Sequence, residues 1–130
     1  MRIEIPEYKT LNIDTIFADF NGTLAIDGVI PPSVRQRILT LAGNFQIYVL
    51  TADTNGTAKE QCEGSRHCAA IGNGRNDELM LREAALSIAV MDQEGAYGKV
   101  MREADLCTGC IEDALDLLIY PKRIIAGLRG

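Results

Sequence analysis

Residues 16–23 read Ile-Phe-Ala-Asp-Phe-Asn-Gly-Thr, and this stretch decides the fold class. A short apolar run ends at a single carboxylate, Asp19, and a tight polar turn follows at once. This pattern is typical of a carboxylate at the carboxyl end of a buried parallel strand, where open α/β sheets place their functional groups. Residues 49–51 end a second apolar run in the same way, and residues 71–77 end a third. We therefore expect a parallel sheet with polar side chains along its carboxyl edge.

Strand-like and helix-like patterns alternate along the rest of the chain. Residues 2–5 and 11–13 are expected to pair as an edge hairpin, because Pro6 stops the first of them. The expected core strands are residues 14–19, 45–51, 67–71, 86–91 and 105–107, and the expected helices are residues 31–42, 57–63, 76–85, 96–104, 111–118 and 122–128. The alternation predicts a Rossmann-like three-layer α/β sandwich, with a mainly parallel sheet covered on both faces.

The composition fits a single domain that spans residues 1–130. The chain has 130 residues, of which 47% are hydrophobic and 24% charged, so it can form one core. A net charge of −5 offers no basic surface for nucleic acid. No apolar run approaches the roughly 18 residues of a membrane span, and the first residues lack the apolar core of a signal peptide. We expect a cytoplasmic protein with neither nucleic acid nor membrane as partner.

The four cysteines are interpreted as reduced thiols, because disulfides are rare in the cytoplasm. Cys107 and Cys110 form a CxxC pair, but the only histidine, His67, lies far away in the sequence. A CxxC pair alone is a weak signal for zinc or for a redox dithiol. We therefore expect Cys62, Cys68, Cys107 and Cys110 to be buried thiols that fill an apolar face.

Asp19 has the position and the neighbours that phosphoryl transfer needs. A carboxylate can attack phosphorus and form an aspartyl phosphate, which water later hydrolyses. The turn at residues 21–23 can direct backbone N–H groups at the phosphoryl oxygens, and the hydroxyl of Thr51 can hold another oxygen. A Mg²⁺ ion bound by oxygen ligands would neutralise the carboxylate and the phosphate. A helix cap is the alternative for Asp19 alone, but Thr51 and Asp77 also follow strand-like runs directly.

Two motifs, Asp19-Phe-Asn-Gly-Thr-Leu24 and Gly72-Asn-Gly-Arg-Asn-Asp77, are fairly specific. Together with Thr51 they resemble the haloacid-dehalogenase-like (HAD) phosphotransferase superfamily. The closest match is its small soluble branch related to the phosphorylation domain of P-type ATPases, and the resemblance covers about the whole chain. It implies a Mg²⁺-dependent phosphohydrolase or phosphotransferase that forms an aspartyl phosphate from a phosphorylated substrate.

The resemblance also assigns roles to individual residues. The catalytic positions are Asp19 as nucleophile, Asn21, Thr51 and, as a candidate for the family's lysine, Lys59. The phosphate would contact Gly22, Thr23, Ala52 and Arg75. The Mg²⁺ ligands would be Asp19, the carbonyl of Asn21, Asn73 and Asp77.

The chain departs from the family pattern at two of these positions. Many family phosphatases have a second aspartate two residues after the nucleophile, which acts as general acid and base. This chain has Asn21 at that position. Its amide cannot exchange protons, so hydrolysis of the intermediate should be slow, as in P-type ATPases. Family members usually bind Mg²⁺ through an aspartate at the position of Asn73. We therefore expect weaker metal binding, with Asp77 as the remaining acid there.

Residues 52–66 form an unusually short connection between two of the expected core strands. The family has a helix, a strand and another helix there, so we expect a sheet lacking one βα unit. No insertion is long enough for a cap domain, and a homo-oligomer could cover the open site. Connections between parallel strands are almost always right-handed. We therefore expect the helix in this connection to pack on the face of the sheet that the lysine-bearing helix covers in the family. Lys59 would then replace that lysine, although a solvated surface lysine is the commoner outcome for this residue type.

Two other functions stay open from the sequence. Asn21, Asn73 and the short connection favour a catalytically weak or inactive relative that binds a phosphorylated ligand or a protein. A receiver-like signalling domain would need an acidic pair near its N-terminus, for which Glu4 and Glu7 are poor matches. The motif at residues 72–77 also has no place in a receiver.

Overall fold

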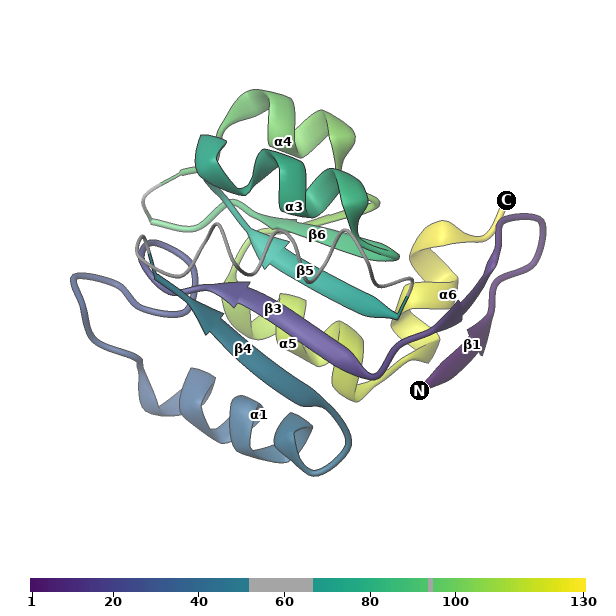
Figure 1. Cartoon of the computed structure of the whole chain (residues 1–130), viewed down its shortest axis with the longest axis horizontal. Helices are drawn as coiled ribbons and strands as arrows, with labels where there is room; N and C mark the ends of the chain where they lie inside the picture. The colour runs from purple at the N-terminus through teal and green to yellow at the C-terminus, as the bar shows by residue number, and fades with distance from the viewer. Residues whose placement is uncertain (52–66, 94) are drawn as a thin grey trace.

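The computed structural model describes residues 1–51, 67–93 and 95–130. At its centre is a parallel five-stranded sheet in the order β4-β3-β5-β6-β7 (Figure 1). The strands are β3 (Thr15–Asp19), β4 (Gln46–Leu50), β5 (Cys68–Gly72), β6 (Leu86–Val90) and β7 (Leu106–Thr108). The apolar runs therefore predict each core strand to within one residue, and the α/β fold class is confirmed.

Helices cover both faces of this sheet. They are α1 (Pro32–Ala42), α3 (Glu78–Glu83), α4 (Gly98–Glu103), α5 (Ile111–Ile119) and α6 (Lys122–Leu128). Helices α1, α5 and α6 pack on the face that presents Ile16 and Ile88, and α3 and α4 pack on the face that presents Phe17 and Ala70. Two of the three interior strands, β5 and β6, are buried along their whole length. This explains why their sequences are apolar throughout instead of alternating.

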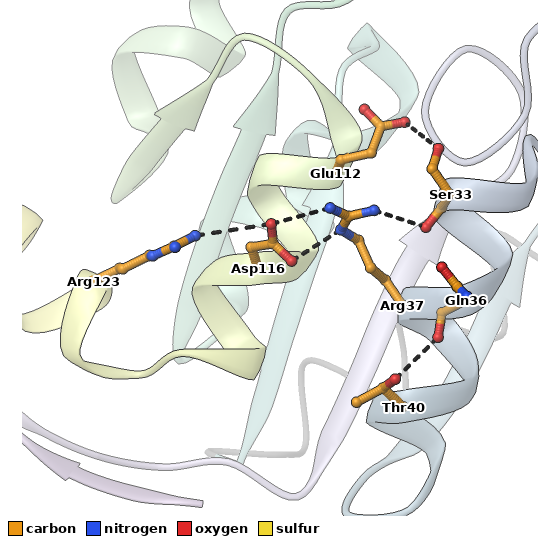
Figure 2. Close-up of polar contacts among 7 residues, drawn as sticks. All are labelled: Ser33, Gln36, Arg37, Thr40, Glu112, Asp116 and Arg123. Atoms are coloured by element: carbon orange, nitrogen blue, oxygen red, sulfur yellow. Dashed lines mark hydrogen bonds and ion pairs between the residues drawn. The ribbon is translucent and has the colours of Figure 1, made fainter.

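Polar contacts join α1 to α5 on the outer side of their layer (Figure 2). The Nε of Arg37 donates to Asp116 at 2.9 Å, and its Nη1 donates to the carbonyl of Ser33 at 3.0 Å. The hydroxyl of Ser33 donates to Glu112 at 3.3 Å, and Arg123 of α6 lies 3.8 Å from Asp116. These pairs are partly exposed to solvent, so they orient the helices more than they stabilise them.

A two-stranded antiparallel hairpin lies at the amino end of the sheet, away from the carboxyl edge. It consists of β1 (Arg2–Glu4) and β2 (Thr10–Asn12), as the sequence predicts. The hydroxyl of Tyr8 donates to Asp105 at 2.7 Å, and the ammonium of Lys9 donates to the carbonyl of Ala85 at 2.8 Å. These contacts fix the hairpin to the residues that precede β6 and β7.

The expected absence of one βα unit concerns residues 52–66 and stays a prediction, but the order of the described strands is clear. Strand β3 pairs with β4 on one side and with β5 on the other, so these two described strands lie on opposite sides of β3. Within the described residues, no strand pairs with the outer side of β4. The connecting residues 52–66, with Ala52 and Lys59, lie outside the described part of the chain, so the prediction for Lys59 stays a prediction. No helix in the described ranges has the length and apolar character to cross a bilayer.

Two expectations are corrected by the structure. The helix predicted at residues 76–85 is a 3₁₀ turn, η1 (Arg75–Asp77), followed by the short α3, because the chain becomes extended again at Ala84. The prediction of buried thiols is right for Cys68 but wrong for Cys107, which is exposed, and for Cys110, which is partly exposed. Cys107 lies on the edge strand β7, where the sheet ends. Cys62 lies outside the described residues.

Candidate active site

Three strands end side by side at the carboxyl edge of the sheet. Asp19, the last residue of β3, pairs with Leu50 of β4, so Thr51 lies directly beyond this pair. On the other side, the register between β3 and β5 places Gly72 beside Asp19 and Asn73 at the next position. The edge that the sequence predicts as the functional edge therefore carries the expected residues.

Residues 20–25, which we call the Asp19 loop, fold back over the end of β3. The N–H of Leu24 donates to the carbonyl of Asp19 at 3.2 Å, and the N–H of Gly22 donates to the carbonyl of Ala25 at 2.9 Å. Gly22 has a φ of 76°, which explains the glycine at this position because other residues rarely adopt it. Thr23 is completely buried, and its hydroxyl lies 3.5 Å from a carboxylate oxygen of Asp19.

Asp77 is completely buried beneath this edge. Its Oδ2 accepts hydrogen bonds from the N–H groups of Asn73 (3.2 Å) and Gly74 (3.0 Å), at the start of the η1 turn. A Cβ atom at Gly72 would lie only 2.7 to 2.8 Å from three side-chain atoms of Asp77. Residue 72 is therefore a glycine because the Asp77 side chain occupies the space beside it.

The carboxyl group of Asp77 acts on the pKa of Asp19. Asp19 is 7% exposed, and its pKa is raised from 3.8 to about 7. Burial is the largest cause, followed by the negative charge of Asp77 and by a hydrogen bond between the two carboxyl groups. The N–H of Phe20 and the hydroxyl of Thr23 act in the opposite direction. Two buried acids that influence each other in this way favour a shared proton or a bound cation.

We expect the metal-free protein to lose stability as the pH rises from about 4 to about 7. Because the folded-state pKa of Asp19 lies above the unfolded value, the folded protein binds more protons within this window. Its stability is therefore greatest below the window and falls as Asp19 ionises. This rise in the pKa of Asp19 corresponds to a loss of roughly 4 kcal/mol across the window. Thermal denaturation in a chelator across this pH range measures the effect.

The variant Asp19→Asn serves as the comparison for this measurement. It has no ionisable group at position 19. As the pH rises, the Tm of the wild type should therefore fall relative to the Tm of the variant. Added Mg²⁺ should reduce that difference at high pH by neutralising the carboxylate pair. A Tm difference that does not change with pH would show that Asp19 titrates normally in the folded protein.

Asn73 contacts both the Asp19 loop and a segment further along the chain. Its Nδ2 donates to the carbonyl of Gly22 at 2.9 Å and to the carbonyl of Gly95 at 3.3 Å. Its Oδ1 accepts a hydrogen bond from the hydroxyl of Thr23 at 3.1 Å. The carbonyl of Asn73 also accepts from the N–H of Tyr97 at 2.7 Å. Sequence reasoning missed Gly95 and Tyr97, because both act through backbone groups that any residue type possesses.

The other predicted site residues that the structure describes lie at the surface. Asn21 and Thr51 are exposed near the end of the sheet, and Arg75 is exposed on the η1 turn. Their predicted contacts with a phosphate or a metal stay predictions. Among residues 1–51, 67–93 and 95–130, no three side chains of His, Cys, Asp or Glu form a group able to hold a metal. Among these described residues, the buried acids at this edge of the sheet are Asp19 and Asp77.

Comparison with curated proteins finds two relatives from Methanocaldococcus jannaschii, both of uncharacterized function. MJ0073 is 48% identical over 60 residues, which are 46% of this chain and 64% of that protein. MJ0072 is 45% identical over 40 residues, which are 31% of this chain and 91% of that protein. The chain belongs to the same family as MJ0072. It spans less than two thirds of MJ0073, and no family model matches the chain.

Solved structures identify the fold. A hydrolase from Legionella pneumophila assigned to HAD subfamily III A aligns with a TM-score of 0.55 at 16% identity, covering 88% of each chain. The fold is HAD-like. Two further HAD-like structures are 3-deoxy-D-manno-octulosonate 8-phosphate phosphatase from Moraxella catarrhalis, solved with magnesium and phosphate, and the cobalt-bound phosphatase YrbI from Haemophilus influenzae. Their TM-scores are 0.55 and 0.54, at 18% and 14% identity. The first alignment covers 82% of this chain and 86% of the other, and the second covers 90% of each.

The predicted resemblance to the HAD superfamily is thus confirmed at the level of the HAD-like fold. At these identities the likeness concerns the fold alone. The narrower assignment to a branch related to P-type ATPases stays a prediction.

Proposed function

We propose that the protein is a phosphohydrolase that forms an aspartyl phosphate on Asp19. The observation that carries this proposal is the buried pair of Asp19 and Asp77 at the carboxyl edge of the sheet. Neighbouring buried acids are costly for stability, and acids with strongly shifted pKa values cluster at functional sites. The HAD-like fold and the phosphatases among the structural neighbours support the same chemistry.

The reaction would proceed in two displacements. A carboxylate oxygen of Asp19 attacks the phosphorus, and the bond to the substrate's ester oxygen breaks, so that the alcohol leaves with a proton taken from solvent. Water then attacks the phosphorus of the aspartyl phosphate, which releases inorganic phosphate and regenerates the carboxylate. The N–H group of the exposed Asn21 in the Asp19 loop and the hydroxyl of Thr51 are proposed to bind the phosphoryl oxygens.

The donor set at this edge fits a divalent cation. The carboxylates of Asp19 and Asp77 supply two negative oxygens, and hard cations such as Mg²⁺ prefer oxygen ligands. The amide oxygen of Asn73 accepts one hydrogen bond and keeps a second lone pair for a metal, and the carbonyl of Asn21 is the other proposed ligand. The cation supplies positive charge that neutralises the carboxylates and the phosphate.

We expect Asn21→Asp to speed hydrolysis of the phosphoenzyme by about 10²-fold, the scale of general acid–base catalysis. The wild-type amide cannot take a proton from the attacking water, whereas a carboxylate at this exposed position can. Single-turnover decay of the phosphoenzyme after removal of substrate measures the rate. An unchanged decay rate in a folded variant would place residue 21 away from the path of proton transfer.

The proposal is tested by release of phosphate from p-nitrophenyl phosphate and from a panel of phosphomonoesters. Activity is expected with Mg²⁺ and not with a chelator. Comparison of the rates across the panel identifies the substrate class. A protein that binds Mg²⁺ but releases no phosphate from any compound would contradict the proposed function.

A further inference from the structure

We propose that Asn73 is a positioning residue whose carboxamide joins the Asp19 loop to the segment of residues 95–97, and that an aspartate cannot replace it. Its effect on turnover rests on the proposed function, but its structural effect does not. The inference distinguishes this chain from a family pattern in which the same position carries a metal-binding carboxylate.

The contacts of Asn73 reach three separate parts of the chain. Its Nδ2 donates hydrogen bonds to the carbonyls of Gly22 (2.9 Å) and Gly95 (3.3 Å), which are far apart in the sequence. Its own carbonyl accepts from the N–H of Tyr97 at 2.7 Å, and its own N–H donates to Asp77 at 3.2 Å. Asn73 therefore connects the Asp19 loop, the η1 turn and residues 95–97 at one point.

The surroundings require an amide at this position. Carbonyl oxygens only accept hydrogen bonds, so the atom that faces Gly22 and Gly95 must be the NH₂ group. An ionised aspartate has no proton to donate, and one of its oxygens would face both carbonyls. Because Asn73 is only 9% exposed, water could not relieve that repulsion.

The same contacts hold the hydroxyl of Thr23 beside Asp19. The Oγ1 of Thr23 lies 3.1 Å from Oδ1 of Asn73 and 3.5 Å from Oδ2 of Asp19. Loss of the amide would free both Gly22 and Thr23, two of the buried residues that shape the turn after Asp19. Misplacement of a reacting group by about 1 Å can cost about 10²-fold in rate.

The first test compares Asn73→Ala and Asn73→Asp with Asn76→Asp. The control adds the same charge on the η1 turn at an exposed residue. With p-nitrophenyl phosphate at saturating Mg²⁺, both Asn73 variants should lose about 10- to 10²-fold in kcat with little change in KM, and the control should not. Saturation with Mg²⁺ removes any effect of metal affinity. Wild-type kcat in Asn73→Asp would overturn the proposal.

Thermal denaturation in a chelator keeps the test independent of catalysis. Both Asn73 variants should lower Tm by about 5 to 10 °C relative to Asn76→Asp. If the wild type had no phosphatase activity, the proposed function would fail while this shift still supported the role of Asn73. Asn73 variants as stable as the control would overturn the proposal whether or not the enzyme is active.

A second pair of variants removes the same connection from its other end. Tyr97 has a φ of −66°, which proline adopts, so Tyr97→Pro deletes the N–H that donates to Asn73. Tyr97→Ala keeps the N–H and is the matched control. Hydrogen exchange of the amides of Leu24 and Ala25 should be at least about tenfold faster in Tyr97→Pro than in Tyr97→Ala. Equal exchange in the two variants would show that the segments are not joined through Asn73.

Discussion

Replacing Asp19 with asparagine is expected to reduce phosphatase turnover by at least about 10³-fold while the fold stays intact. The asparagine has nearly the same shape but no carboxylate that can attack phosphorus. Its neutral side chain also removes the repulsion with Asp77 in the buried site, so unfolding should not explain the loss. Steady-state hydrolysis of p-nitrophenyl phosphate, together with circular dichroism, measures both effects.

Asp14→Asn is the matched control for this variant. Asp14 is exposed directly before β3, at the opposite end from Asp19, and accepts a hydrogen bond from Thr15 that an asparagine can also accept. Its turnover should equal that of the wild type. Turnover that survives in Asp19→Asn would exclude the covalent mechanism, because the nucleophile would then be another group.

Gly72→Ala is expected to lower both turnover and metal affinity, each by about 10²-fold. The new methyl group would meet the Cβ, Cγ and Oδ2 atoms of Asp77 at 2.7 to 2.8 Å. Because the Cβ of Asp77 is among these atoms, rotation of the side chain alone cannot relieve the clash, and the backbone of Asp77 must move. The carboxylate would then lose its hydrogen bonds from the N–H groups of Asn73 and Gly74. Titration with Mg²⁺ by calorimetry and the steady-state rate report the two effects.

Gly98→Ala makes the same chemical change where space is free. A Cβ atom at Gly98 meets no atom within 4 Å, and this residue begins helix α4. The control should keep wild-type turnover and Mg²⁺ affinity, because alanine is a better helix former than glycine. Normal Mg²⁺ binding in Gly72→Ala would mean that Asp77 does not hold the metal.

The sequence predicts the carboxyl edge of the sheet well, because each strand that ends there is a short run of apolar residues. Apolar runs end at Asp19, Thr51 and Asn73, and the parallel register then brings these ends together. Asp77 follows from the glycine-rich turn after the third run. Side chains that lie at the ends of strands are therefore predictable from the pattern alone.

The connection through Asn73 could not be predicted in the same way. Its partners at Gly22, Gly95 and Tyr97 are backbone groups, which carry no residue-type signal. The sequence indicates a neutral metal ligand at position 73, whereas the geometry also explains why a donor is needed there. The exposure of Cys107 was missed for a different reason, since composition does not reveal which strand forms the edge of a sheet.

Trapping the phosphoenzyme tests the central claim most directly. The protein is mixed with p-nitrophenyl phosphate and Mg²⁺, quenched in acid and treated with borohydride, which reduces an aspartyl phosphate to homoserine. Peptide mapping by mass spectrometry should find homoserine at position 19 in the wild type and in Asp14→Asn, in an amount that depends on substrate. A phosphoryl group or homoserine at any other residue, or steady phosphate release with position 19 unmodified, would contradict the assignment of Asp19 as the nucleophile.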